Sequence, residues 1–321
     1  MTGRSAPASA QVKACCAAAY SQDAVALVLG GSYHPGGLAL TRRLARALGL
    51  RPGWRVVDVA SGSGATARLL AAEYAVTVDG VELAESAVGR ARSAADEADL
   101  SRSVRFHRGD AERLPLSDAI ADAVVCECAL CTFPDKAAAA AEFARVLRPG
   151  GRAGVTDVTV ADGLPEELRT LAAWVACIAD ARPVAEYTDI LARAGLATVS
   201  VEVHDGAIAR MIEQIEARLT VLRMSAAARL AAAGVDVDAV MRYTTLAKQA
   251  VADGLIGYCM LVAEKPAGGA RSMPPAARLP TNCWPGCAPD AGARQHGHAS
   301  WPCRRAVRHI RRGGVRVRLP R

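Results

Sequence analysis

The feature that most constrains this chain is a glycine turn, Asp58-Val-Ala-Ser-Gly62-Ser-Gly64, between two regular segments. An apolar run with β-branched residues (55–59) precedes the turn, and a helix-like stretch (65–74) follows it. Because glycine has no Cβ, the backbone of such a turn can approach a ligand closely, and the amides at the start of the next helix face the crevice beyond the strand. The turn therefore predicts a cofactor site at the carboxyl end of the first strand.

Short β-branched runs alternate with helix-like runs from about residue 53 to residue 160. This alternation implies right-handed crossovers and a doubly wound, mostly parallel sheet with helices on both faces. Later runs at 197–204 and 255–264 complete an expected sheet of seven strands. We predict a Rossmann-like α/β fold with four regions: an N-terminal helical cap (1–52), a cofactor-binding domain (53–160), a substrate-side region with a C-terminal helical insertion that completes the sheet (161–266), and a disordered basic tail (267–321).

The charge of the chain is unevenly distributed. Residues 268–321 contain eleven arginines and one acid, about +10, so the formal net charge of +7 leaves about −3 for the rest. A mildly acidic body without interleaved basic and aromatic residues argues against a nucleic-acid partner. No run approaches the roughly 18 apolar residues of a membrane span, and the first 14 residues lack a signal-peptide centre. We expect a cytoplasmic protein without a membrane partner, and the oligomeric state is not predicted.

Acidic residues follow the predicted strands at one edge of the sheet. Asp58, at the tip of the first strand, suits a cationic or amine-bearing ligand and would repel a pyrophosphate. Glu82 closes the second strand 24 residues later, which suits a carboxylate that accepts hydrogen bonds from ribose hydroxyls; Asp79 is the competing ribose partner. Asp110, after the third strand, is placed to accept a hydrogen bond from an adenine amino group.

The glycine turn, Glu82, Asp110 and the Arg148-Pro-Gly-Gly151 turn, at this spacing, resemble the class I S-adenosylmethionine-dependent methyltransferases over residues 53–158. The resemblance implies the methyltransferase form of the fold, S-adenosylmethionine as cofactor and methyl transfer as activity. A nicotinamide-dependent reductase is a distant alternative, since Ala67 stands where the third glycine of its motif belongs. The residues expected to bind the cofactor are Asp58, Ala60, Gly62, Gly64, Glu82, Leu83, Asp110, Ala111 and Glu127.

Cysteines occur in three separate segments that can reach this site. Cys128 follows Cys126 by two residues in the fourth strand, so both face the same side, and Cys128 is nearer the carboxyl end. Cys177 lies beyond the fifth strand, and Cys15 and Cys16 form a pair in the cap. Buried cysteines are commonly small hydrophobic residues. We assign that role to Cys126, Cys131 and Cys259.

The cap pair, Cys128 ahead of Pro134-Asp-Lys136, Asp157, and Trp174-Val-Ala-Cys177 ahead of Tyr187 resemble the arsenite methyltransferase family over about residues 11–200. By this resemblance Cys128, Cys177 and either Cys16 or Cys15 bind trivalent arsenic, the substrate, as a trigonal set of catalytic thiolates. The chain departs from the family pattern in Tyr33–Gly37 and in the helical stretch 207–253.

Two other functions remain open from the sequence. One is methyl transfer to oxygen, nitrogen or carbon of a small organic molecule, with His34 or Tyr33 as base. The other is a thiol-rich protein that binds a metalloid without catalysis. An arsenic lone pair needs no deprotonation, so arsenic chemistry requires positioning more than a base. In each case the expected partner is a small molecule.

Overall fold

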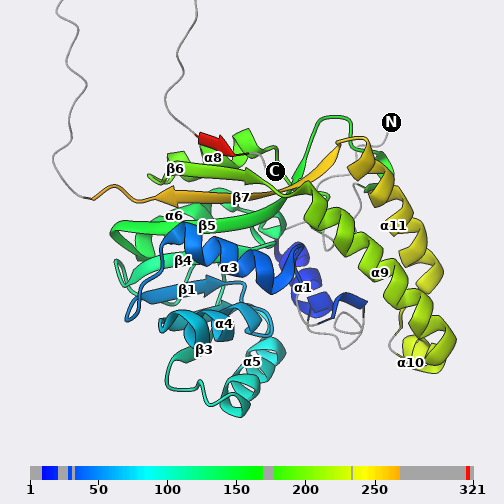
Figure 1. The fold of residues 1–321 in the computed structure, drawn as a ribbon, viewed down its shortest axis with the longest axis horizontal. Coiled ribbons are helices and arrows are strands. Elements are labelled where there is room, and N and C mark those ends of the chain that lie inside the picture. The colour runs from blue at the N-terminus through cyan, green and yellow to red at the C-terminus, as the bar shows by residue number, and fades with distance from the viewer. Residues whose placement is uncertain are drawn as a thin grey trace, which may run out of the picture. The chain divides into compact units, whose positions relative to one another are not determined.

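A twisted sheet runs through the part of the chain that the structure, a computed structural model, describes: residues 9–20, 28–30, 33–168, 177–232, 234–267 and 316–318. Its strands are β1 (Arg55–Val59), β2 (Thr77–Glu82), β3 (Val104–Arg108), β4 (Ala121–Glu127), β5 (Leu147–Val160), β6 (Ala197–Val203), β7 (Ile256–Glu264) and β8 (Arg316–Arg318). Their order is β3-β2-β1-β4-β5-β7-β6-β8 (Figure 1). Strands β1 to β5 pair in parallel, and β7 is antiparallel to both of its neighbours.

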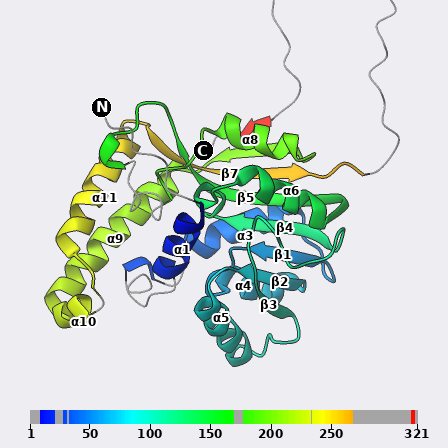
Figure 2. The same ribbon diagram turned by 180° about the vertical axis from the view of Figure 1, so that it is seen from behind.

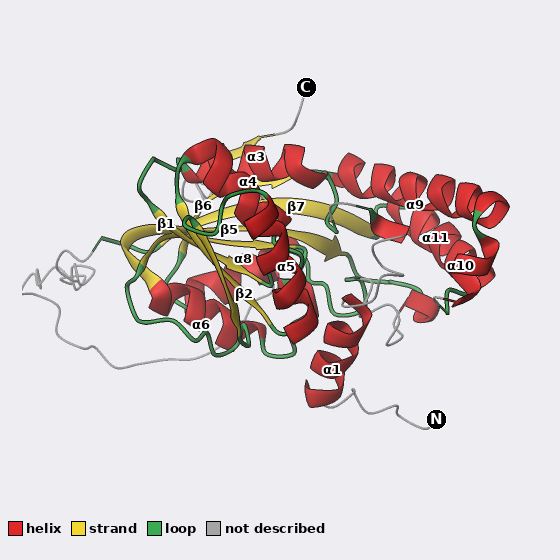
Figure 3. Cartoon of the chain, turned by 90° about the horizontal axis from the view of Figure 1, so that it is seen from below, coloured by secondary structure: helices red, strands yellow, loops and turns green. Residues whose placement is uncertain are grey.

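Helices cover both faces of the sheet, as predicted. Val56 of β1 belongs to one apolar cluster and Val57 and Val59 to another, because successive side chains of a strand point to opposite faces. The first cluster contains residues of α3 (Gly37–Leu48), α4 (Ala65–Tyr74) and α5 (Glu85–Glu97), and the second contains residues of α6 (Lys136–Val146) and α8 (Val184–Arg193). Figure 3 shows α3 and α6 on opposite sides of the strands. Burial on both faces explains the continuous apolar run 123–126 in the central strand β4.

Further helices lie outside these two layers. Helix α1 (Ser9–Tyr20) belongs to the predicted cap, and the predicted helical stretch 207–253 forms α9 (Asp205–Ser225), α10 (Ala227–Ala232) and α11 (Val237–Ala252). Helices α9 and α11 pack side by side, as Figures 1 and 2 both show. The stretch is interrupted near Gly234, whose φ of +69° is incompatible with a continuous right-handed helix.

The predicted doubly wound, mostly parallel sheet of seven strands is confirmed. Our prediction of a wholly disordered tail is wrong for residues 316–318, because β8 pairs in parallel with β6 as an eighth, edge strand. Strand β5 begins at Leu147, so it includes the Arg148–Gly151 stretch that we expected to form a turn before it. The sequence also predicts a helix over about 165–179, of which residues 169–176 lie outside the described residues. Within the described ranges, no helix is both long and apolar enough to cross a bilayer.

Gly64→Ala is expected to destabilise the fold by about 2 to 4 kcal/mol, because it combines backbone strain with overpacking. Gly64 has a φ of +73°, and an added Cβ would lie 2.3 Å from Cζ of Phe106. Gly53→Ala is the matched control, since Gly53 has a φ of +81° and no atom within 4 Å of the added Cβ. Urea denaturation should show a loss of only about 1 kcal/mol for the control. Equal losses in both variants would contradict the packing argument.

Candidate functional site

A pocket opens where the glycine turn, the ends of β2 and β4, the loops after β3 and β4, and helix α1 meet. The space inside it is about 1160 Å³ when the mouth open to solvent is included. Eight of the nine residues predicted to bind the cofactor line it: Asp58, Ala60, Gly62, Glu82, Leu83, Asp110, Ala111 and Glu127. The ninth, Gly64, is not part of the lining, and it precedes α4 in a left-handed conformation.

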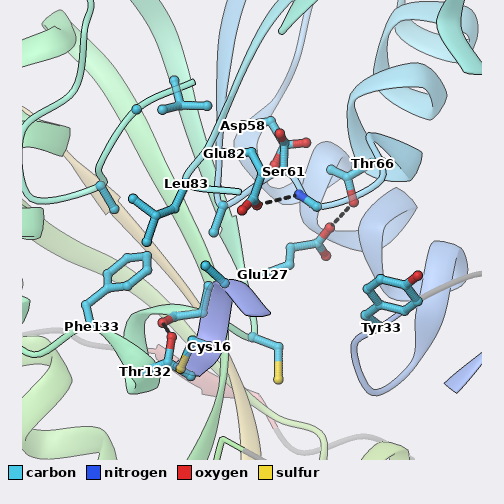
Figure 4. Close-up of a pocket in the computed structure, with 18 of the residues that line it drawn as sticks. Cys16, Tyr33, Asp58, Ser61, Thr66, Glu82, Leu83, Glu127, Thr132 and Phe133 are labelled. Atoms are coloured by element: carbon cyan, nitrogen blue, oxygen red, sulfur yellow. Dashed lines mark hydrogen bonds between the residues drawn. The ribbon is translucent and has the colours of Figure 1, made fainter. Parts of the chain in front are cut away.

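Glu82 braces the glycine turn at the end of β2. The N–H of Gly62 donates to Oε2 of Glu82 at 3.0 Å, and the N–H of Ala84 donates to Oε1 at 2.9 Å. The N–H of Ser61 donates to the carbonyl oxygen of Val81 at 3.1 Å, so the turn is joined to β2 through backbone as well. Figure 4 shows Glu82 directed at the turn. Each carboxylate oxygen retains a second lone pair that can accept a hydrogen bond from a ligand hydroxyl.

Asp79, the competing ribose partner, does not line the pocket. Its side chain is 5% exposed and lies 2.6 Å from Nε of Arg55 and 2.9 Å from Nε2 of His107. These contacts join β1, β2 and β3 at a distance from the turn. The structure therefore places Glu82, and not Asp79, at the pocket.

Asp58 and Ser61 present buried acceptors at the pocket. Among the described residues, Oδ2 of Asp58 and Oγ of Ser61 have no hydrogen-bond partner. Burial, and next the charge of Glu127, raise the pKa of the Asp58 carboxyl well above its ordinary value, against an opposing backbone hydrogen bond from Ala67. An unsatisfied buried acceptor is costly, so this pair fits a ligand that brings N–H donors or positive charge.

Glu127, at the end of β4, is held by two threonine hydroxyls. Thr41 of α3 donates to its Oε2 at 3.0 Å. Thr66 of α4 donates to the same oxygen at 2.6 Å (Figure 4). Nε2 of His34 lies 3.6 Å from the same oxygen. Sequence reasoning missed both threonines, although the place of Thr66 in the helix after the glycine turn was a usable signal.

Cys128 and Cys177, predicted from distant segments, lie together. The Cys177 thiol donates to the carbonyl oxygen of Cys128 at 3.3 Å, and the two thiols hydrogen-bond each other. Cys128 lines the pocket. Both residues have the left-handed backbone, with φ values of +53° and +64°. That conformation is costly for a side chain with a Cβ and is most common at functional sites.

Cys131, assigned to the core, is indeed buried, but it also contacts both of these thiols. Its side chain hydrogen-bonds those of Cys128 and Cys177. The short 3-10 helix Leu130–Thr132 turns the chain back after β4 and brings residue 131 beside residue 128. The sequence spacing of three residues did not reveal this contact, because the turn was not predicted.

Cys16 lines the pocket from α1, whereas Cys15 does not. Burial, and next the neighbouring Cys177 and Cys15, raise the pKa of the Cys16 thiol to about 12. Figure 4 shows Cys16, Thr132 and Phe133 at one end of the pocket, and Asp58, Ser61 and Glu82 at the other. The pocket therefore has a thiol end and a carboxylate end.

The Cys16, Cys128 and Cys131 thiols have raised pKa values in the ligand-free chain, and thiolate ligation of arsenic stays a prediction. The Cys131 thiol lowers the pKa of Cys128, but the hydrogen bond with Cys177 and burial outweigh it and leave that pKa well above the ordinary value. Burial chiefly raises the pKa of Cys131 as well. Within the described ranges, no three or more His, Cys, Asp or Glu side chains are arranged to hold a metal ion. The free thiols of Cys128, Cys131 and Cys177 hydrogen-bond one another.

Asp110 is engaged by a residue that sequence reasoning missed. Nζ of Lys13, on α1, lies 2.7 Å from Oδ2 of Asp110 and also contacts Glu112. Lys13 lines the pocket together with Asp110. The carboxylate expected to recognise adenine is thus already paired with a cation.

Comparison with known proteins identifies the domain. Residues 57–155 match a family model described as a methyltransferase domain. Over 118 residues the chain is 41% identical to the 27-O-demethylrifamycin SV methyltransferase of Amycolatopsis mediterranei, covering 37% of this chain and 43% of that protein. Over 189 residues it is 29% identical to the arsenite methyltransferase of Halobacterium salinarum, covering 58% and 47%.

The fold resembles that of phosphoethanolamine N-methyltransferase 2 from Haemonchus contortus, solved with S-adenosyl-L-methionine, with a TM-score of 0.66 at 20% identity over 76% of this chain and 56% of that one. The chain spans less than half the length of the two curated relatives. Residues 57–155 thus match a methyltransferase domain, and the solved structure shows likeness of fold. The pocket would fit S-adenosylmethionine, because its carboxylates and the unsatisfied Asp58 and Ser61 acceptors suit a cationic ligand with an amine and hydroxyl groups.

Glu82→Gln is expected to weaken S-adenosylmethionine binding roughly 10- to 100-fold, because hydrogen bonds to a charged acceptor are replaced by weaker ones. Asp79→Asn is the matched control on the same strand. It should lower the free energy of unfolding by about 1 to 3 kcal/mol through its buried ion pairs, and leave affinity nearly unchanged. Isothermal titration calorimetry and urea denaturation measure the two effects, and the reverse pattern would reassign the ribose site to Asp79.

Asp157 is expected to make stability fall as pH rises from about 4 to about 7. The carboxyl is fully buried, accepts from the N–H of Cys131 at 2.9 Å, and has a pKa raised from 3.8 to about 7, chiefly by burial and next by Cys177. In this window the folded state holds a proton that the unfolded state has lost, so raising the pH favours unfolding. The wild-type stability relative to Asp157→Asn should therefore decline by on the order of 3 kcal/mol between these pH values. A constant difference in urea denaturation would contradict this.

Proposed function

We propose that this protein is an S-adenosylmethionine-dependent methyltransferase whose acceptor is trivalent arsenic held by Cys128, Cys177 and Cys16. The observation that carries the proposal is that Cys16 and Cys128 line the pocket from separate segments and that Cys177, from a third segment, contacts Cys128. Cys128 and Cys16 line the pocket, and Cys177 hydrogen-bonds Cys128 and raises the pKa of Cys16. Soft sulfur donors select a soft, thiophilic centre.

The protonation state of the thiols suits arsenous acid better than a metal cation. When a neutral arsenic hydroxide exchanges with a protonated thiol, an As–S bond replaces an As–O bond, and the thiol proton leaves with the hydroxyl as water. Three such exchanges bring no net charge into a buried site. A divalent cation would instead require deprotonation of thiols whose pKa values burial has raised.

The carboxylate end of the pocket positions the cofactor, and the thiol end positions the acceptor. S-adenosylmethionine supplies an electrophilic methyl group on a sulfonium. We assign Glu82 and Asp110 to its ribose and adenine, Asp58 offers a buried acceptor for an N–H donor, and Glu127 offers a carboxylate near a cationic ligand. The thiols fix the acceptor and orient its lone pair, so the chain needs no base at the acceptor.

The loop that carries Cys128 is held against the sheet. The N–H of Cys128 donates to the carbonyl oxygen of Thr156 on β5 at 2.6 Å, and Asp157 accepts from the N–H of Cys131. Lys136 at the end of the same loop donates to the carbonyl oxygens of Cys131 and Phe133 at 2.9 and 3.0 Å. A loop anchored at these points favours a fixed thiol position, which catalysis by alignment requires.

A second function, methylation of a small organic acceptor, is favoured by His34. Its Nε2 lies 3.6 Å from the buried Glu127 carboxylate and 3.4 Å from Oγ1 of Thr41, inside the same pocket. An imidazole oriented by a carboxylate is an arrangement typical of a general base. In that case the cysteines only pack.

Cys128→Ser and Cys177→Ser are each expected to reduce arsenite methylation at least 100-fold, because a serine oxygen does not replace a soft sulfur ligand. S-adenosylmethionine binding should survive in both. The assay incubates the protein with S-adenosylmethionine, a thiol reductant and arsenite, and detects methylated arsenicals by mass spectrometry. Cys15→Ser is the matched control, since Cys15 adjoins Cys16 but does not line the pocket.

The outcomes separate the three functions. Loss with both serine variants but not with Cys15→Ser or His34→Gln supports the arsenic acceptor. Full arsenite methylation in the Cys128 and Cys177 variants overturns it. Arsenite that binds the wild-type protein without methylated product indicates a binding protein, and thiol-independent methylation of an organic acceptor that His34→Gln abolishes indicates the second function.

A further inference from the structure

A single lysine joins the helix that carries Cys16 to two other segments of the site. Nζ of Lys13 lies 2.7 Å from Oδ2 of Asp110 and also contacts Oε2 of Glu112. The other oxygen of Asp110 accepts from the N–H of Glu112 at 3.0 Å. The other oxygen of Glu112 accepts from the N–H of Asp135 at 2.8 Å, at the end of the loop that begins with Cys128.

The position of Lys13 on α1 links this contact to the thiol. Residues three and four apart lie on the same face of a helix, so Lys13, Cys16 and Ala17 share one face. All three line the pocket. Val12, beside Lys13, is fully buried. Anchoring Lys13 therefore sets which face of α1 meets the pocket, and with it the place of the Cys16 thiol.

We propose that Lys13 is a positioning residue that docks α1 against Asp110 and Glu112 and thereby places Cys16 at the thiol end of the pocket. Glu112 contacts both Lys13 and the backbone N–H of Asp135 in the Cys128 loop. One ionic cluster therefore fixes the position of the Cys16 thiol relative to that of the Cys128 thiol. Asp110 belongs to the cofactor pocket, so the docked position of α1 and the adenine end of the site share one carboxylate.

The ion pairs of Lys13 with Asp110 and Glu112 are of a strength that suits reversible docking of α1. The side chains of Lys13, Asp110 and Glu112 are 24%, 35% and 14% exposed, so water screens the ionic contacts in part. An exposed ion pair contributes little to the free energy of docking. A lysine shared by two partly buried carboxylates contributes more than a single exposed pair does. Loss of these ionic contacts should therefore raise the fraction of molecules in which α1 is undocked roughly 3- to 30-fold, without unfolding the domain.

The test is alkylation of Cys16 by iodoacetamide in the full-length protein, followed peptide by peptide by mass spectrometry. Lys13→Met should speed alkylation of Cys16 roughly 3- to 30-fold, and Lys13→Arg should restore the wild-type rate to within about 2-fold. Lys248→Met is the matched control. Nζ of Lys248 lies 3.1 Å from Oε2 of Glu216, and neither residue lines the pocket. Cys259, which is 1% exposed in β7, is the internal reference for global unfolding.

An unchanged alkylation rate of Cys16 in Lys13→Met overturns the proposal. If Lys13→Met speeds alkylation of Cys259 as well, Glu112→Gln takes its place, since glutamine retains an acceptor for Asp135 but loses the charge facing Lys13. That variant should speed alkylation of Cys16 alone, and failure to do so also overturns the proposal.

Only the catalytic consequence rests on the proposed function: Lys13→Met should then lower kcat for arsenite more than it alters the KM for S-adenosylmethionine. The labelling experiment needs no acceptor. A protein that does not methylate arsenite but shows faster Cys16 alkylation in Lys13→Met contradicts the arsenic acceptor and retains the role of Lys13.

Discussion

The pairing of β4 between β1 and β5 is the constraint on which the site depends. Cys126 pairs with Val59 on one side and with Val155 on the other, so β1 and β4 end within one residue of each other while β5 continues beyond them. Because they are parallel, the glycine turn, Glu127 and the Cys128 loop all emerge at the same edge. The hydrogen bond from Cys128 to Thr156 extends this register one residue beyond β4. The distance between the cofactor pocket and the thiols is thus set by the backbone of the sheet.

Burial then decides the chemistry that each end of the pocket can perform. At the carboxylate end, Asp58 is buried without a complete set of partners, which favours a ligand that brings donors and positive charge. At the thiol end, the raised pKa values favour neutral exchange over the binding of a cation. Asp157 lies behind the thiols with a raised pKa of its own, so the sheet side of this cluster adds little negative charge at low pH. The arsenic proposal depends on these protonation states as well as on proximity.

Much of the fold and of the cofactor end could be predicted from sequence, for local reasons. The glycine turn, the strand-end acids and the alternation of strands and helices each depend on residues close in the chain, and parallel topology then forces strand ends together. The same reasoning failed where partners come from distant segments. The role of Lys13 required the docking of α1, whereas the preference for Glu82 over Asp79 already followed from the place of Glu82 at the strand end. Cys131 was assigned to the core because buried cysteines are commonly small hydrophobic residues, whereas a short helical turn also brings it to Cys128.

By itself the sequence determined the strand–turn–helix unit, the order of the elements, the carboxylates at the strand ends and the presence of cysteines in three segments. These follow from local conformational preference and from the period of apolar residues, which a linear pattern records. Only the tertiary structure decided that Cys16 rather than Cys15 reaches the pocket, that the thiols hydrogen-bond one another in protonated form, and that Lys13 ties α1 to Asp110. Burial, charge pairing and pKa depend on which residues meet across the chain, and that proximity exists only after folding.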